Sequence, residues 1–307
     1  MSSGLAVEIA GLRLSNPTML AAGILGLSAA SLQDAARQGA GAVVSKSVSL
    51  EPRSGYGNPA VFQLDNCGLL NAMGLPNPGA KHFAQEIRDF KKNELRAPII
   101  ASVFGFSANE FAEAAQILVT GGADAVELNV SCPHVEKTGS EIGQNPYLVS
   151  EVVRGVKSSV RAPVFVKLTP NLADIAEVAE AAVGAGADAI VAVNTARGMA
   201  IDIETAYPVL ANKTGGLSGS ALKPIAVRCV YEIYQAVRVP IVGCGGIATW
   251  QDAVEFILAG ASAIQIGTAV ASQGLGVFRS VNIGIDRYMH DKGFRSVKEI
   301  VGLSHRR

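Results

Sequence analysis

Two kinds of hydrophobic pattern alternate along most of this chain. Short, continuous apolar runs such as Val164–Val166 are followed by longer segments in which apolar residues recur every three or four positions, as in Ala108–Thr120. A continuous apolar run indicates a buried strand, and the longer period indicates a helix with one buried face. The alternation therefore predicts a parallel sheet that is covered by helices.

Two local signatures mark where the strands begin. In the first, a glycine that ends a helix precedes a run of small and apolar residues, at Gly39–Val44, Gly122–Glu127, Gly186–Val191 and Gly260–Gln265. In the second, a proline occupies the first strand position, where no hydrogen-bond donor is needed, at Ala97–Ile100, Ala162–Phe165 and Val239–Val242. With Thr18–Ala22 at the start, these runs predict eight strands.

Helical patterns separate the strands, at Ser31–Gln38, Ala80–Asn93, Ala108–Thr120, Pro146–Val160, Leu172–Val183, Leu222–Ala236 and Trp250–Leu258. Repeated strand–helix units are right-handed, and eight of them close into an α/β fold, the (β/α)8 TIM barrel. We expect one domain over residues 1–307, with residues 5–14 forming a short hairpin at the barrel floor. Two long connections, near residues 47–79 and 195–220, are expected to carry function at the C-terminal face.

Composition excludes several classes of protein. Lys plus Arg and Asp plus Glu both number 26, and this balance argues against nucleic acid as a partner. The four cysteines form no C-x-x-C motif, so we expect neither a metal site nor an iron–sulfur cluster in this chain. Neither a signal peptide nor an apolar run of the ~18 residues of a membrane span is evident. We expect a cytoplasmic protein with no membrane partner.

Polar residues stand where the predicted strands end. In a (β/α)8 barrel the chemistry lies at the C-terminal ends of the strands. A buried ammonium group is costly, so two of these residues, Lys46 and Lys167, are expected to meet an anionic or carbonyl-rich ligand. Glycines after the last two strands indicate a phosphate held by backbone N–H groups. The set is Lys46, Asn129, Lys167, Asn194, Thr195, Gly245, Gly246, Gly267 and Thr268. The alternative is that the asparagines cap loops and that the glycines only form turns.

The most informative loop follows the strand that ends at Asn129. It reads Asn129-Val-Ser-Cys-Pro-His134, and a thiol can serve as a proton acceptor because its pKa lies near ~8.5 and can be lowered. An inert, half-buried Cys132 before a turn-forming proline is the alternative. The loop at residues 71–79 is dense in Asn, Gly and Pro, which is typical either of successive turns or of an edge that binds a carboxylate.

In combination, these motifs resemble the dihydroorotate dehydrogenase family. The resemblance spans nearly the whole chain in the family's motif order, and cysteine at position 132 is like the class 1 enzymes. Residues 209–224 are similar to the 1B branch, which passes electrons to NAD through a separate subunit carrying FAD and a [2Fe–2S] cluster. The matching segments are Lys46-Ser47, Asn71–Leu75, Glu127–Pro133, Val166–Pro170, Val193–Thr195, Gly243–Ile247 and Gln265–Thr268.

The resemblance implies a role for each matching residue. Cys132 is the implied catalytic base, which takes the C5 proton of dihydroorotate, while N5 of FMN takes the C6 hydride. The implied substrate contacts are Lys46, Asn71, Ala72, Met73, Gly74, Leu75, Asn129, Asn194 and Thr195. The implied FMN contacts are Lys46, Ser47, Asn129, Lys167, Val193, Gly219, Gly245, Gly246, Gly267 and Thr268. No metal is implied.

The resemblance also implies an assembly. At two positions, the sequence departs from the pattern of the family. A homodimer that pairs with two electron-transfer subunits, giving a heterotetramer, is the implied state. Ala22 stands where many relatives have Ser, and Ser102 stands where many have Asn. Both positions belong to the flavin edge in the family, so these departures bear on how tightly the flavin is held and on its potential.

Three other functions remain open at this stage. A different FMN barrel could act on dihydropyrimidines, as in the pyrimidine-reducing domain of dihydropyrimidine dehydrogenase, whose loop is similar. A flavin-free lyase or isomerase would use Lys167 as a Schiff-base amine and the glycines for a substrate phosphate. A non-catalytic binding barrel is the third.

Overall fold

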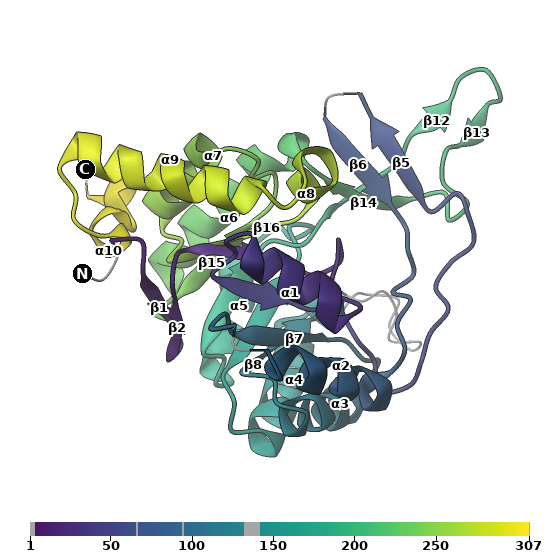
Figure 1. Cartoon of the computed structure of the whole chain (residues 1–307). Helices are drawn as coiled ribbons and strands as arrows, with labels where there is room; N and C mark the ends of the chain where they lie inside the picture. The colour runs from purple at the N-terminus through teal and green to yellow at the C-terminus, as the bar shows by residue number, and fades with distance from the viewer. Residues whose placement is uncertain (1–3, 66, 94, 132–141, 307) are drawn as a thin grey trace.

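The computed structural model describes residues 4–65, 67–93, 95–131 and 142–306, and its centre is a closed parallel barrel (Figure 1). The strands follow one another around the barrel in the order β10-β15-β16-β3-β4-β7-β8-β9. The (β/α)8 prediction is thereby confirmed. The barrel strands are β3 (Thr18–Leu20), β4 (Ala42–Val44), β7 (Ile99–Val103), β8 (Ala125–Asn129), β9 (Val164–Leu168), β10 (Ala189–Ala192), β15 (Ile241–Cys244) and β16 (Ala263–Ile266).

Helices surround the barrel and follow most strands. All seven predicted helices are present, and three more lie near the C-terminus, where the sequence analysis named none. The helices are α1 (Ala29–Arg37), α2 (Ala80–Lys91), α3 (Ala108–Thr120), α4 (Pro146–Ser159), α5 (Ile175–Gly184), α6 (Lys223–Ala236), α7 (Trp250–Ala259), α8 (Thr268–Gln273), α9 (Val277–Lys292) and α10 (Val297–Ile300).

The start of α5 corrects one predicted boundary. This helix begins three positions after the predicted Leu172, because Asp174 is its N-cap and accepts hydrogen bonds from the backbone N–H groups of Ala176 and Glu177 at 2.9 and 3.2 Å. A side-chain oxygen that satisfies free N–H groups defines the first turn of a helix. The apolar period alone did not reveal that cap.

The glycine signature has the predicted structural basis, whereas each proline of the other signature lies one residue before its strand and not in the first strand position. The four signature glycines, Gly39, Gly122, Gly186 and Gly260, have φ angles of 105–126°, a backbone region that other residues rarely adopt. Each proline of the second signature directly precedes its strand. It has no N–H to donate, but its carbonyl oxygen accepts a hydrogen bond from the neighbouring strand. The backbone N–H of Val126, for example, donates to the carbonyl of Pro163 at 2.9 Å.

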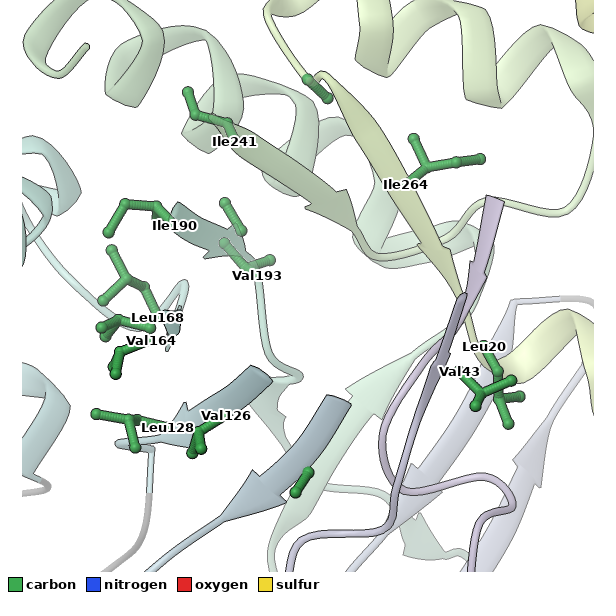
Figure 2. Close-up of a cluster of buried hydrophobic side chains, with 14 of the residues drawn as sticks. Leu20, Val43, Val126, Leu128, Val164, Leu168, Ile190, Val193, Ile241 and Ile264 are labelled. Carbon is green, nitrogen blue, oxygen red and sulfur yellow. The ribbon is translucent and has the colours of Figure 1, made fainter. Parts of the chain in front are cut away.

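The barrel has two apolar layers. Inside it, residues on alternate strand positions pack together, and the largest of them is the fully buried Phe165. Outside it, side chains such as Val126, Leu168 and Ile241 point toward the surrounding helices, as Figure 2 shows. The opposite directions follow from the alternation of side chains along a strand.

A hairpin covers the N-terminal end of the barrel, as predicted. Strands β1 (Val7–Ile9) and β2 (Leu12–Leu14) pair antiparallel, with Val7 opposite Leu14. Ile9 and Leu14 are buried in the interior cluster, together with Met19 and Ala42. Because the hairpin fills this end, the opposite end is the one that can admit ligands.

The two long connections contain regular secondary structure, for which the sequence analysis made no prediction. They form one four-stranded sheet of order β11-β14-β6-β5, from β5 (Val61–Leu64), β6 (Gly68–Asn71), β11 (Ala196–Gly198) and β14 (Gly215–Ser218). A further hairpin, β12 (Ile201–Asp202) and β13 (Tyr207–Pro208), extends beyond it (Figure 1). We call the four-stranded unit the mouth sheet. In Figure 1 it lies on the side of the barrel away from both termini.

Candidate active site

A large cleft lies between the C-terminal ends of the barrel strands and the mouth sheet. Its volume is about 1890 Å³. A pocket for one small ligand usually has a volume of about 300–1,000 Å³, so this cleft has room for two ligands side by side. A smaller groove of about 540 Å³ lies on the outer helices α6, α7 and α9, where Tyr231, Trp250 and Tyr288 make it largely apolar.

The cleft brings together nearly all the predicted site residues. Every proposed substrate or cofactor contact lines it, from Lys46 and Ser47 to Gly267 and Thr268, including the segment Asn71–Leu75. Cys132 lies outside the described residues. The roles of all these residues stay predictions, because the location of a side chain does not by itself assign its function.

A chain of hydrogen bonds orients the two asparagine amides. Asn194 Nδ2 donates to Asn129 Oδ1 at 3.0 Å, and Asn129 Nδ2 donates to Ser47 Oγ at 3.1 Å. Ser47 Oγ in turn lies 2.9 Å from Ser102 Oγ. At the other end, the backbone N–H of Thr195 donates to Asn194 Oδ1 at 2.8 Å. Each Nδ2 keeps one further hydrogen for a ligand, so the amides present donors of fixed direction.

The segment from Asn71 to Leu75 is held from both sides. Asn71 Nδ2 donates to the carbonyl of Gly216 on β14 at 3.2 Å. Arg53 Nε donates to the carbonyl oxygen of Gly74 at 2.9 Å. The backbone N–H of Tyr56 donates to the carbonyl oxygen of Met73 at 3.0 Å. These bonds fix the edge of the cleft that the sequence analysis predicted to bind a carboxylate.

Lys46 has the environment that the sequence analysis predicted. It is partly buried at the end of β4, and burial lowers the pKa of its ammonium group. Among the described residues, no acidic side chain forms an ion pair with it and none raises its pKa. A partly desolvated cation without an anion partner favours the binding of an anionic group.

Lys167 differs from that prediction because the protein itself supplies partners. Its ammonium group donates to Gln265 Oε1 at 3.1 Å and lies 3.8 Å from Glu127 Oε1. Both lysines line the cleft, but only Lys46 is without a partner among the described residues. The sequence analysis overlooked Glu127 and Gln265 because both lie within strands, and only the barrel register shows that they face inward.

Unpaired backbone donors line another part of the cleft. Gly245 and Gly246 have φ angles of 128° and 78°, and a side chain on Gly246 would come within 2.8 Å of the backbone oxygen of Gly219. Within the described part of the chain, the N–H groups of Gly245, Gly246 and Gly267 have no protein acceptor. Consecutive free N–H groups of this kind form an anion-binding concavity. The arrangement fits the phosphate of a flavin mononucleotide.

Two further residues of this region were missed or misjudged. Ser102 was set aside as a departure from relatives, yet its hydroxyl is fully buried against Ser47. Cys244 was not among the predicted site residues, yet it lines the cleft and interacts with Lys167. Its position next to the Gly245–Gly246 pair, at the end of a strand, was the signal that could have indicated this.

The fold and the cleft define a class of protein. A (β/α)8 barrel with free backbone donors, oriented amides and an unpaired lysine at its C-terminal mouth is typical of enzymes that bind a phosphate-bearing cofactor beside a small polar substrate. The family model described as "Dihydroorotate dehydrogenase" matches residues 4–289, and the chain belongs to this family. Enzymes of the family in general depend on a flavin.

Curated relatives resemble the chain over nearly its full length. A protein of Methanosarcina acetivorans is 52% identical over 299 residues, which cover 97% of this chain and 95% of that protein. Proteins of Methanosarcina mazei and Pyrococcus abyssi are 53% and 51% identical, covering 99% and 98% of this chain and 96% and 99% of theirs. All three are named "Dihydroorotate dehydrogenase B (NAD(+)), catalytic subunit". In the described part of the chain, no helix has the length and hydropathy of a membrane span.

Proposed function

We propose that this chain oxidises (S)-dihydroorotate to orotate, a step of pyrimidine (UMP) synthesis, with FMN bound in the cleft. The observation that carries the proposal is the composition of the cleft. It combines free backbone donors for a phosphate with oriented amides and a partnerless lysine for a small anion, in a chain of this family.

The chain's own residues would bind and orient the substrate. The carboxylate of dihydroorotate is the anion that Lys46 lacks, and it would also meet the edge formed by Asn71–Leu75. The free Nδ2 hydrogens of Asn129 and Asn194 would hold the ring carbonyls. Fixed donors of this kind place the reacting carbon atoms before the reaction begins, which lowers the entropic part of the barrier.

Cys132 is the proposed proton acceptor. Oxidation removes a proton from C5 and a hydride from C6, and a C5–C6 double bond forms. A thiolate is accessible near neutral pH, whereas the alkoxide of a serine is not, so a cysteine suits the proton transfer. When bound, the flavin supplies the hydride acceptor. The charge of Lys167 would stabilise negative charge that develops beside it.

The electron acceptor and the assembly complete the proposal. The curated relatives are named as catalytic subunits of an NAD(+) enzyme. We infer that electrons leave this chain for a separate subunit that carries FAD and a [2Fe–2S] cluster and reduces NAD. A homodimer of this chain with two such subunits is the assembly we propose.

A spectrum of the purified chain tests the proposed activity. Dihydroorotate added without oxygen should bleach the visible flavin absorption, and dihydrouracil should leave it unchanged. Bleaching by dihydrouracil alone would instead assign the chain to dihydropyrimidines. A colourless protein to which FMN does not bind would favour a flavin-free lyase that uses Lys167 as its amine.

A further inference from the structure

A carboxylate lies fully buried inside the barrel and has no part in the reaction proposed above. Glu127 lies on β8, two positions before Asn129, and its side chain has no exposed surface. An isolated buried carboxylate is costly, so its partners decide why it is tolerated. The barrel register places Glu127 opposite Ser102 on one side and Phe165 on the other.

The partners of Glu127 connect it to Lys167. Gln265 Nε2 donates to Glu127 Oε2, and Gln265 Oε1 accepts a hydrogen bond from Lys167 Nζ at 3.1 Å. Glu127 Oε1 has no hydrogen bond within the described residues, and its nearest charged neighbour is Lys167 Nζ at 3.8 Å. Because β16 does not neighbour β8 or β9, Gln265 reaches across the barrel interior to link the two charges.

Two titratable groups act on Lys167, Glu127 from β8 and Cys244 from β15. Burial opposes the charge of Lys167, but Cys244 and Glu127 outweigh burial and raise the pKa of the lysine. Burial also raises the pKa of the Cys244 thiol, and the neighbouring Lys167 opposes that shift. Of these two groups Glu127 is the carboxylate, and its Oε1 lies 3.8 Å from the ammonium group.

Stability alone does not account for this arrangement. Apolar residues of similar volume can usually replace a buried ion pair without loss of stability, so its presence is weak evidence for a structural role. Buried charged groups with strongly perturbed environments, next to a cleft, are instead typical of functional sites. Lys167 lines the cleft, whereas Glu127 does not.

We propose that Glu127, held by Gln265, is a positioning residue that keeps the Lys167 ammonium group charged and fixed at the cleft, and thereby sets the reduction potential of the bound flavin. The inference rests on the proposed function, since it requires flavin in the cleft. Glu127 acts only through Lys167, which is the residue that faces the ligand.

The test is a redox titration of the bound flavin in Glu127→Gln between about pH 6 and pH 10, a range that lies below the usual pKa of lysine, about 10.4. Without the carboxylate, burial is opposed by one partner fewer, so the pKa of Lys167 falls below that in the unaltered protein and the lysine loses its proton at a lower pH. At low pH the unbalanced cation should shift the potential above that of the unaltered protein. At high pH the neutral amine should shift it below, so the two curves cross. Parallel curves would overturn the inference.

Four further variants keep the test specific. Glu127→Asp retains the charge and should restore the original shape of the curve, and Glu151→Gln, an exposed residue on α4, should leave the curve unchanged. If Glu127→Gln does not fold, the double variant Glu127→Gln/Lys167→Met removes both charges together. Its potential should equal that of Lys167→Met at every pH, and a difference would show that Glu127 acts without Lys167.

The outcomes separate this inference from the proposed function. A purified protein whose flavin is not bleached by dihydroorotate contradicts the proposed function. A protein whose flavin is bleached, but whose Glu127→Gln curve runs parallel to the original, contradicts only the role of Glu127.

Discussion

The two strand-end lysines differ in what surrounds them, and the roles proposed for them follow from this difference. Lys46 has no anion partner among the described residues, so its charge is available to a ligand. Lys167 is balanced by Glu127 and held by Gln265, so its charge is available only in a fixed position. A substrate carboxylate needs the first kind of cation, and a tuned cofactor environment needs the second.

The thiol at position 132 makes the first residue-scale prediction. Cys132→Ala should keep the bound flavin and still bind orotate, but lose dihydroorotate oxidation at neutral pH, because the proton acceptor is removed. Turnover with an artificial dye and the visible spectrum measure the two properties. Cys67→Ala, which changes an exposed cysteine outside the cleft, is the matched control and should retain activity. Near-normal turnover in Cys132→Ala would remove the cysteine from its role.

Ser102 makes the second residue-scale prediction. Ser102→Ala removes the hydroxyl that fixes Ser47 and, through it, the Asn129 amide. A neutral hydrogen bond contributes about 0.5–1.5 kcal/mol, so the KM for dihydroorotate should rise by roughly 2–10-fold. Steady-state kinetics measure this. Ser150→Ala removes a similar bond between α4 and α5, and its KM should not change. An unchanged KM in Ser102→Ala would argue that the amides are oriented without it.

At the scale of elements, local signals determined most of what could be predicted. Glycine with positive φ and proline before a strand act within a few residues, so seven of the eight barrel strands were predictable from these two signatures. The mouth sheet was not, because Asn71 on β6 and Gly216 on β14 are 145 positions apart in the chain. Most of the residues that we predicted for the site line the cleft, because barrel strands end there, whereas the inward direction of Glu127 and Gln265 required the register.

One helix cap provides a prediction at this scale. Thr249 is the N-cap of α7, and its Oγ1 accepts a hydrogen bond from the backbone N–H of Asp252. In return, the Asp252 carboxylate accepts a hydrogen bond from the backbone N–H of Thr249. Thr249→Ala should lower the free energy of unfolding by about 1 kcal/mol and leave turnover unchanged. Urea unfolding followed by circular dichroism measures it. Thr120→Ala, an exposed residue at the end of α3, controls for the loss of a threonine, and equal stability of the two variants would contradict the capping role.

At the scale of the whole molecule, the proposed assembly assigns the transfer of electrons to NAD to a second subunit. Within the described residues, no group of cysteine, histidine or acidic side chains could hold a metal ion. The purified chain, supplied with dihydroorotate, should therefore reduce an artificial dye but form no NADH. Addition of an electron-transfer subunit that carries FAD and a [2Fe–2S] cluster should start NADH formation, which absorbance follows. Efficient NADH formation by the chain alone would contradict the proposed assembly.

The mouth sheet has a consequence for how this molecule can be altered by engineering or by evolution. One of its central strands, β6, comes from the segment after β4, and the other, β14, comes from the segment after β10. Exchange of only one segment for that of a distant homologue would leave an exposed strand edge with unmatched hydrogen-bonding groups. The two segments must therefore be inherited or transplanted as a pair.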